Sequence, residues 1–457
     1  MALIKVGLEI HVYPLMESKN KLFCGCKIEI NAPPNSNICE ICTGQPGAHP
    51  MKPNKEAIIK SLAISKILGC TIDDKPAFQR KHYSWPDLPS GYQRTMSGAY
   101  AKPMAINGSF NGVRIMQVHL EEDPARWDPE TGIIDYNRSG TPLVEIVTEP
   151  DFTTTKQVRE WLESLRVHLD HADCFDERLG IKADVNISIE PGYQRVEIKN
   201  INSFTSIIEA IEYETKRQST ELSVGNTILF ETRMWNGTET LPMRTKEGSS
   251  DYRFIPEQDL PRIIIDTNTL REVEERGIID IESMLNNLLK SGMKAEDANI
   301  MIMNPVLYRH AIIMIDKGTG GEDAGIFLRR ELLRVTNYHN EHPRMFKGTT
   351  NSMITLLNIY KEGKITDKIM RTIMEELYHN DFDVEKHIMD NSLSSISDED
   401  ELSRVVDDVI SKNPKAAQDY RAGAIESINF LTGQIMRIMK GKADVKKTQD
   451  IIRRKLE

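Results

Sequence analysis

The sequence predicts an α+β fold: an N-terminal cradle domain with a largely antiparallel sheet, followed by a helical domain and a small helical tail domain. Strand-like alternation of apolar and polar residues recurs through the first 295 residues, with amphipathic helices between the alternating stretches. Helical patterns dominate from about Asp297 onward. The chain has 457 residues, and at about 150 residues per domain this length predicts about three domains.

The expected elements follow these patterns along the chain. Ile4–Val12 alternates apolar and polar residues, and so do 184–190 and 196–199, which predicts three strands. A helix is predicted where apolar residues recur at helical spacing, at Val158, Trp161, Leu162, Leu165 and Leu169. Further helices are expected at 324–335 and 367–378.

These patterns divide the chain into four parts. We expect the cradle domain at 1–295, the helical domain at 296–391, a linker at 392–401 and the helical tail at 402–457. The linker is inferred from its polar and acidic composition. No internal repeat at the periods of solenoid proteins is visible in the sequence.

The composition excludes several classes of protein. Hydrophobic residues make up 39% of the chain and charged residues 28%, which is ordinary for a globular protein and excludes a wholly disordered one. No run of about 18 apolar residues occurs, so no membrane span is expected. The N-terminus lacks the basic segment and apolar region of a secretory signal, which favours a cytoplasmic protein.

The charge is distributed unevenly. The net charge of the whole chain is −10, but residues 402–457 carry twelve Lys and Arg against seven Asp and Glu. The tail therefore has a net charge of +5 and the rest of the chain −15. Such a basic tail can neutralise several phosphates, which favours RNA binding, although a solvated helical face has the same pattern.

Four of the six cysteines form two close pairs. Cys24 and Cys26 are separated by one residue, Cys39 and Cys42 by two, and twelve residues lie between the pairs. Two pairs of thiolates across a short loop can form a closed tetrahedral zinc site. We therefore predict structural Zn²⁺ here; the alternative is four unrelated buried thiols.

Carboxylates and a histidine lie on the polar faces of the expected strands. Glu9 and His11 share one face of the first strand, because side chains alternate along a strand. Glu145 lies inside an apolar stretch, where an ionised carboxylate needs a partner. Other candidates lie on or near strands: Glu122, Asp184, Glu197 and Lys199. Together they could bind a divalent cation that carries phosphate, or they could form a solvated sheet face.

Familiar nucleotide and nucleophile motifs are missing from the sequence. There is no G-x-x-x-x-G-K-[ST] loop, so an ATP site would not be of the P-loop type. There is also no G-x-S-x-G nucleophile elbow. Basic residues near Lys81 and around Lys246 could hold phosphate or could be solvated surface.

Seven ordered motifs resemble one known family. They are VGLEIHV at 6–12, the cysteine cluster followed by GQPGA at 44–48, KHYSWPDLP at 81–89, HLEED at 119–123, DYNRSGTPLVE at 135–145, EIKNINSF at 197–204 and YRFIPE at 252–257. The chain resembles the B subunits of the aspartyl/glutamyl-tRNA(Asn/Gln) amidotransferases. The resemblance extends over essentially the whole length, including the glycine-containing tail.

The resemblance implies an ATP-dependent transamidation in which residues 1–295 form the kinase and transamidase domain. The substrate would be a misacylated Glu-tRNA(Gln) or Asp-tRNA(Asn). ATP and Mg²⁺ would phosphorylate its side-chain carboxylate, and ammonia would then displace the phosphate. The ammonia would come from a glutaminase A subunit, with a small C subunit completing the complex.

The resemblance also assigns residues, position by position. Glu9, His11, Glu122 and Glu145 would be catalytic and would bind Mg²⁺, with Lys81 catalytic and beside the ATP site. Further cofactor-binding residues would be Asp184, Lys199 and Lys246. The four cysteines match the zinc ligands of many members, and the tail at 402–457 would bind tRNA.

Two other functions fit parts of the sequence. One is a zinc-stabilised RNA-binding adaptor whose acidic sheet face is merely solvated. The other is a metal-dependent phosphodiesterase that uses Glu9, His11 and Glu145. ATP consumption that depends on misacylated tRNA distinguishes the amidotransferase from both.

Overall fold

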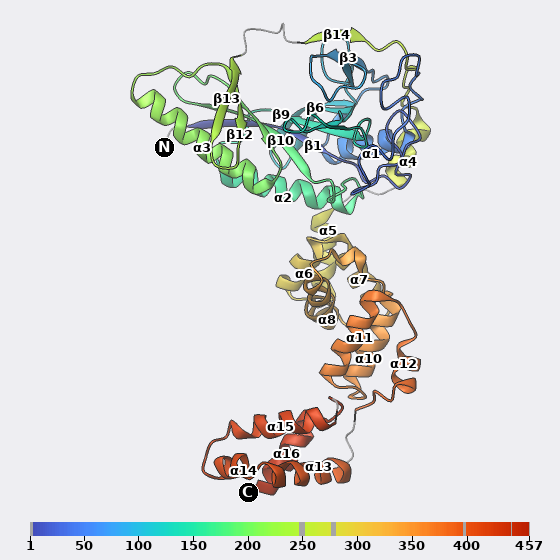
Figure 1. Ribbon diagram of the computed structural model, residues 1–457, viewed down its shortest axis with the longest axis vertical. Helices are drawn as coiled ribbons and strands as arrows, with labels where there is room; N and C mark the ends of the chain where they lie inside the picture. Colours follow the sequence, from blue (N-terminus) through green and yellow to red (C-terminus); the bar gives the residue numbers. More distant parts are fainter. Residues whose placement is uncertain (1–2, 246–251, 276–279, 396–398, 440, 457) are drawn as a thin grey trace. The chain divides into compact units, whose positions relative to one another are not determined.

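The computed structural model describes residues 3–245, 252–275, 280–395, 399–439 and 441–456 (Figure 1). The chain divides into two compact units, Met1–Ile279 and Asp280–Glu457. The first unit contains a large sheet with helices, and the second is helical. The α+β fold predicted from the sequence is confirmed.

The sheet of the first unit is almost entirely antiparallel. Its main path runs in the order β13-β12-β11-β10-β1-β9-β6-β4-β3-β14, and among the strands that the structure describes only β11 and β12 pair in parallel. The bounds of these strands are β1 Ile4–Val12, β3 Gln79–His82, β4 Tyr92–Thr95, β6 Val113–Glu122, β9 Pro142–Thr148, β10 Ile181–Ile189, β11 Val196–Ile201, β12 Glu231–Trp235, β13 Thr240–Thr245 and β14 Arg253–Pro256. β2 (Thr71–Ile72) pairs with β5 (Ala105–Phe110), which also pairs with β6, while β7 (Arg126–Trp127) and β8 (Ile134–Asp135) form a separate ribbon.

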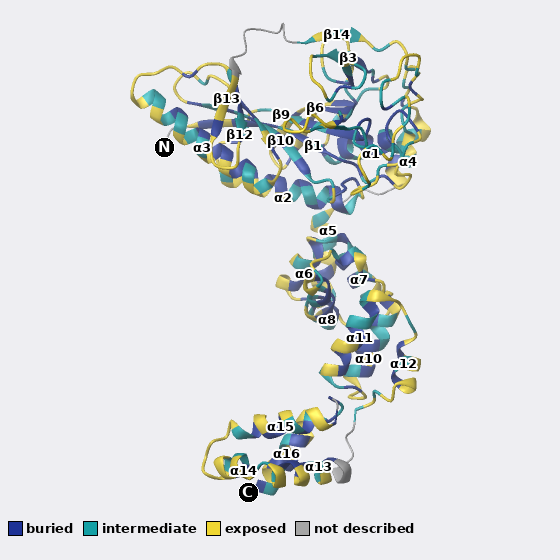
Figure 2. Ribbon diagram, in the orientation of Figure 1, coloured by how far each residue is buried: buried dark blue, intermediate teal, exposed yellow. Residues whose placement is uncertain are grey.

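The three predicted strands are present as β1, β10 and β11. β1 lies near the middle of the sheet, between β9 and β10. Its apolar residues are fully buried, as Leu8 and Ile10 illustrate. In Figure 2, buried residues of the first unit are dark blue, and the exposed residues, in yellow, lie mainly around its periphery.

Helices cover the apolar face of this sheet. α3 (Phe204–Ser223) packs on β10 and β11, α2 (Thr155–His171) packs on α3, and α1 (Lys55–Ile67) packs on β5 and β6. The apolar residues that predicted α2 are all buried: Val158, Trp161, Leu162, Leu165 and Leu169. α2 and α3 begin where Thr154 and Ser203 accept hydrogen bonds from backbone N–H groups of the first turn. A short helix, α4 (Thr267–Glu275), packs against α1. The helices and the hydrophobic core therefore cover one face of the sheet, and the polar residues lie on the other face.

The second unit contains the helices expected after residue 296. Its first part comprises α5 (Ile281–Lys290), α6 (Ala295–Ile302), α7 (Pro305–Asp316), α8 (Gly321–Phe327), α9 (Leu333–Tyr338), α10 (Thr350–Lys361), α11 (Asp367–His379) and α12 (Val384–Asp390). The helix expected at 324–335 is continuous from α8 to α9 but contains a π-helical turn at Leu328–Leu332. A short 3₁₀ turn follows at Pro343–Met345.

The tail has a hydrophobic core of its own. It consists of α13 (Glu399–Lys412), α14 (Pro414–Arg421), α15 (Ser427–Ile438) and α16 (Val445–Leu456). Buried apolar residues from Leu402 to Leu456 form one cluster in it. The described helices include none that is long and apolar enough to cross a membrane.

The domain limits in the structure differ in detail from those expected. The division between the two units falls between residues 279 and 280. Helix α5, which we expected in the cradle domain, packs against α6 and belongs to the second unit. In the expected linker at 392–401, residues 396–398 lie outside the described residues and α13 begins at Glu399. The division of the helical half into a domain and a tail stays a prediction.

Trp161 should contribute strongly to the stability of the first unit. Its ring packs edge-on against Phe110 and Phe152, and its Nε1 donates a hydrogen bond to the Phe110 carbonyl at 2.8 Å. Trp161→Ala should lower the free energy of unfolding by about 3–5 kcal/mol, measured by denaturant titration. The exposed Glu160→Ala on the same helix should change it by less than about 0.5 kcal/mol. Equal effects of the two substitutions would contradict this assignment of the core.

Candidate functional site

Strand register places polar side chains together on the open face of the sheet. His11 lies opposite Glu145 of β9 and Lys182 of β10, and Glu9 lies opposite Asp184. Residues directly opposite in an antiparallel pair point to the same face of the sheet. The alternation predicted from the sequence therefore produces a continuous polar surface across β9, β1 and β10.

The first group on this surface surrounds Glu145. The His11 Nε2 lies 3.7 Å from Glu145 Oε1, and the His119 Nδ1 lies 3.3 Å from Glu145 Oε2. Ligand atoms of His11, Glu121 and Glu145 all lie within 4.8 Å of one another. The His119 Nε2 is buried without a hydrogen-bond partner among the described residues. Two carboxylates and a neutral imidazole at this spacing can bind a divalent cation.

The electrostatics of this group are strongly coupled. Burial alone would raise the pKa of Glu145, but hydrogen bonds with His11 and His119 outweigh it and hold that pKa well below its usual range. Burial would lower the pKa of His11, but contact with Glu145 and the charges of Asp184 and Glu121 raise it to about 9. Burial and the neighbouring Glu145 raise the pKa of Glu121. The protein alone therefore balances these charges with a protonated histidine, whose place a cation could take.

A second group contains three carboxylates and one lysine. Ligand atoms of Glu9, Asp184 and Glu197 lie within 4.8 Å of one another. The Lys199 Nζ forms ion pairs with Asp184 and, at 3.2 Å, with Glu197. Asn186 donates a hydrogen bond to Glu9 at 2.9 Å. Lys199 is therefore a built-in counter-ion for this group, and its position beside Asp184 was not predicted.

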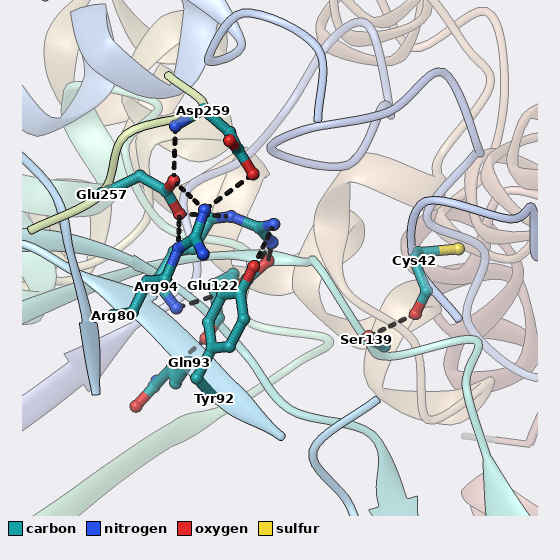
Figure 3. Close-up of polar contacts among 9 residues, drawn as sticks. All are labelled: Cys42, Arg80, Tyr92, Gln93, Arg94, Glu122, Ser139, Glu257 and Asp259. Carbon is teal, nitrogen blue, oxygen red and sulfur yellow. Dashed lines mark hydrogen bonds and ion pairs between the residues drawn. The ribbon is translucent and has the colours of Figure 1, made fainter. Parts of the chain in front are cut away.

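The structure does not bring the Glu122 side chain to either group. The guanidinium of Arg94 lies 3.2 Å from Glu122, and the Arg94 backbone N–H donates to the same carboxylate at 3.0 Å (Figure 3). Arg94 also pairs with Glu257 at 3.0 Å, and Glu257 pairs with Arg80 at 2.7 Å. Because neighbouring residues of a strand point to opposite faces, Glu121 faces His11 and Glu122 does not.

Sequence reasoning therefore missed Glu121. The signal was available, because Glu121 is two residues from His119 and must share its face of β6. His119 was missed for a different reason: its contact with Glu145 depends on the register between β6 and β9, which the sequence does not reveal.

The two predicted lysines differ in what the structure describes. Lys81 on β3 lies with its Nζ 4.6 Å from the centre of the Tyr252 ring. Its charge also reaches Glu121, whose pKa it lowers against the effect of burial. Lys246 lies outside the described residues.

The four predicted cysteines converge on one point. Their sulfur atoms all lie within 4.8 Å of one another, and those of Cys39 and Cys42 are 3.9 Å apart. Tetrahedral zinc with Zn–S bonds of about 2.3 Å requires sulfur atoms roughly 3.8 Å apart. A hydrogen bond with Cys24, together with the nearby Lys21, lowers the pKa of Cys42 to about 5. The donor set and its spacing fit Zn²⁺.

The cysteine loop is tied to the strand that carries Glu145. The Ser139 hydroxyl donates to the Cys42 carbonyl at 2.8 Å (Figure 3), and the Leu22 N–H donates to the Gly140 carbonyl at 2.7 Å. β9 begins two residues later, at Pro142. A metal that fixes the cysteine loop would therefore also fix the entry to β9.

Comparison with known proteins shows the family of this chain. The sequence matches the GatB/GatE catalytic domain over residues 4–271 and the GatB domain over residues 314–456. Three full-length relatives are named as B subunits of aspartyl/glutamyl-tRNA(Asn/Gln) amidotransferases. The Methanocaldococcus jannaschii protein is 38% identical, with 99% of this chain and 98% of the relative covered. The Methanopyrus kandleri protein is also 38% identical (100% and 99% covered), and the Methanothermobacter thermautotrophicus protein is 39% identical (99% and 100%). The chain therefore belongs to the GatB family, the B subunits of the aspartyl/glutamyl-tRNA(Asn/Gln) amidotransferases.

Proposed function

We propose that this chain is the B subunit of a tRNA-dependent amidotransferase. It uses ATP to phosphorylate the side-chain carboxylate of Glu-tRNA(Gln) or Asp-tRNA(Asn), and ammonia then displaces the phosphate. The products are Gln-tRNA(Gln) and Asn-tRNA(Asn). The observation that carries the proposal is the group of His11, Glu121 and Glu145 on the open sheet face of a GatB catalytic domain.

The chemistry explains why such a group is needed. A carboxylate is a poor acyl donor because its leaving group would be oxide, and phosphorylation supplies a better one. Mg²⁺ would neutralise the repulsion between the ATP phosphates and the substrate carboxylate. Glu121 and Glu145 would hold this ion, with Glu9 and His11 beside it.

The surrounding cations have complementary roles in this proposal. Lys81 lies close enough to Glu121 to influence its charge and would contact ATP phosphate. Lys199 pairs with Asp184 and Glu197, which would reduce the repulsion between these acids and the nucleotide. Asp184 and Lys199 would therefore set the charge and shape of the ATP site, and they would not contact the reacting atoms.

The proposal includes partners and a compartment. Ammonia is a nucleophile only when unprotonated, so it must arrive shielded from bulk water. A glutaminase A subunit would release it from glutamine, and a small C subunit would complete the assembly. None of the six cysteines, all of which lie within the described ranges, forms a disulfide, which suits the reducing cytoplasm.

Glu145→Gln tests the cation site. The variant keeps the shape of the side chain and one of its two acceptor oxygens but removes the charge, so it should retain the fold. It should reduce transamidation and tRNA-dependent ATP hydrolysis by roughly 10²- to 10³-fold, since a metal contact contributes several kcal/mol to the transition state. The measurement is ATP-dependent amidation of Glu-tRNA(Gln) and Asp-tRNA(Asn) with the partner subunits supplied.

Two neighbouring residues provide a matched control for this test. Glu121→Gln should resemble Glu145→Gln, whereas Glu122→Gln should lower the melting temperature more than the rate, because Glu122 pairs with the buried Arg94. A Glu145→Gln complex that phosphorylates misacylated tRNA at the normal rate would show that the carboxylate is structural. If only the Glu122 variant lost ATP turnover, the ion would have to be assigned to the opposite face of the sheet, beside Glu122.

Cys39→Ser tests the structural zinc. The variant should lose the bound zinc, and its melting temperature should fall by roughly 5–10 °C, the shift expected from losing about 2–3 kcal/mol. Zinc content by elemental analysis and thermal unfolding measure these effects. Cys70→Ser, a change at a thiol outside the group, should keep the same zinc content as wild type. Protein purified without chelator and found free of zinc would contradict the proposal.

Removing the tail tests its proposed role in tRNA binding. Deletion of 399–457, which begins where α13 begins, should raise the KM for tRNA several-fold and leave the partner's glutaminase activity intact. Wild-type binding should weaken steeply with salt because cationic side chains release counter-ions from the RNA. Replacing the exposed Lys446, Lys447, Arg453 and Arg454 of α16 by Ala should reproduce the effect while keeping the tail folded. An unchanged KM in both proteins would refute this role.

A further inference from the structure

A fourth group of metal-ligating side chains lies in the helical unit, where α9 ends beside α11. Ligand atoms of His339, Glu375 and His379 all lie within 4.8 Å of one another. Glu375 and His379 are four residues apart on α11 and therefore share one face of that helix. His339 directly follows α9, and its Nε2 contacts the Glu375 carboxylate. We propose that these three residues form a site for a divalent transition-metal ion such as Zn²⁺ or Ni²⁺.

The donor set determines which ions the site would bind. Two imidazoles and one carboxylate suit zinc, nickel, cobalt and copper. Mg²⁺ and Ca²⁺ prefer oxygen ligands alone and would bind poorly. Three protein ligands leave at least one position for water, so the site would be open rather than closed like the cysteine group.

The aromatic neighbours hold the rings in place. His339 stacks flat on Tyr378, with ring centres 4.1 Å apart and an interplanar angle of 2°. His379 meets both rings edge-on, at 5.5 Å from His339 and 5.1 Å from Tyr378. This packing fixes the orientation of His339 before an ion binds, which reduces the entropy lost on binding.

An ion could reach the site without any unfolding. The side chains of His339 and Glu375 are 24% and 33% exposed, and His379 is exposed. Metal–nitrogen bonds of about 2.0–2.1 Å require ligand atoms no more than roughly 4.2 Å apart. The ligand atoms lie within 4.8 Å of one another, so at most a small adjustment of the side chains would bring them to that spacing.

A nearby pair that also involves α11 shows what an ordinary ion pair looks like. His387 of α12 and Glu376 of α11 lie 2.7 Å apart, also part-exposed, but the described residues give them no third ligand in the same range. The difference between the two pairs is the second histidine, four residues after Glu375. An ion at the first site would connect α9 to α11, whereas the second pair should bind no metal tightly.

The test is a calorimetric titration with Ni²⁺ of the untagged full chain, loaded with one zinc per chain and then freed of excess zinc by gel filtration. Four thiolates select zinc over two imidazoles and one carboxylate, so this zinc fills the cysteine group and leaves the histidine site open to Ni²⁺. Wild type should bind one Ni²⁺ per chain that the His379→Ala variant does not bind, and its melting temperature should rise with Ni²⁺. His379→Ala and Glu375→Gln should each weaken binding by at least about tenfold, since even residues that only support a ligand contribute this much. His387→Ala should bind as wild type does.

Two results would overturn the proposal. One is that wild type binds no Ni²⁺ at a defined stoichiometry. The other is that the His379 and Glu375 variants bind as tightly as wild type, which would place the ion elsewhere. Because His379 is exposed, its replacement should not disturb folding, and an unchanged circular dichroism spectrum would verify this. The assay does not depend on amidotransferase activity, so its outcome is separate from that of the proposed function.

Discussion

The register of β1 between β9 and β10 is the constraint on which the rest of the first unit depends. Side chains alternate with a period of two, so a slip of one residue would exchange the two faces of the sheet. Leu8 and Ile10 would then face the polar surface, and Glu9 and His11 would enter the core. The cost of burying those charges holds the register, and the register in turn brings His11 to Glu145.

The core and the site are therefore two consequences of one pairing. Helices α2 and α3 cover the apolar face, which keeps the central strands rigid, and the polar face is presented by those same strands. The cysteine loop adds a second restraint through Ser139 and Gly140, at the start of β9. Positioning residues on rigid strands, with a bracing loop at one end, suits a site that must hold several negative charges together.

The sequence predicted those features that depend on residues close to one another in the chain. The alternation of β1, the apolar spacing of α2 and the spacing of the cysteines were sufficient to anticipate those features. Glu122 shows the limit: motif resemblance pointed to the segment at 119–123, but only strand alternation shows that Glu121, and not Glu122, lies near His11 and Glu145. The pairing of Arg94 with Glu257 joins residues far apart in sequence, and the contact of His339 with Glu375 depends on how two helices pack. Neither contact can be predicted from the composition of the sequence or from the spacing of residues along it.

The π-helical turn at Leu328–Leu332 sets the direction in which the helix after it presents its side chains. A π turn accommodates one residue more than an α turn, which rotates the following helix by about 100° around its axis. α9 is the segment so rotated, and it ends at His339. Loss of a single residue from this turn would leave the composition and hydrophobicity of the helix almost unchanged, yet it would turn His339 away from α11. In related chains, the position of the side chain that corresponds to His339 therefore depends on the number of residues in this turn as much as on which residue follows the helix.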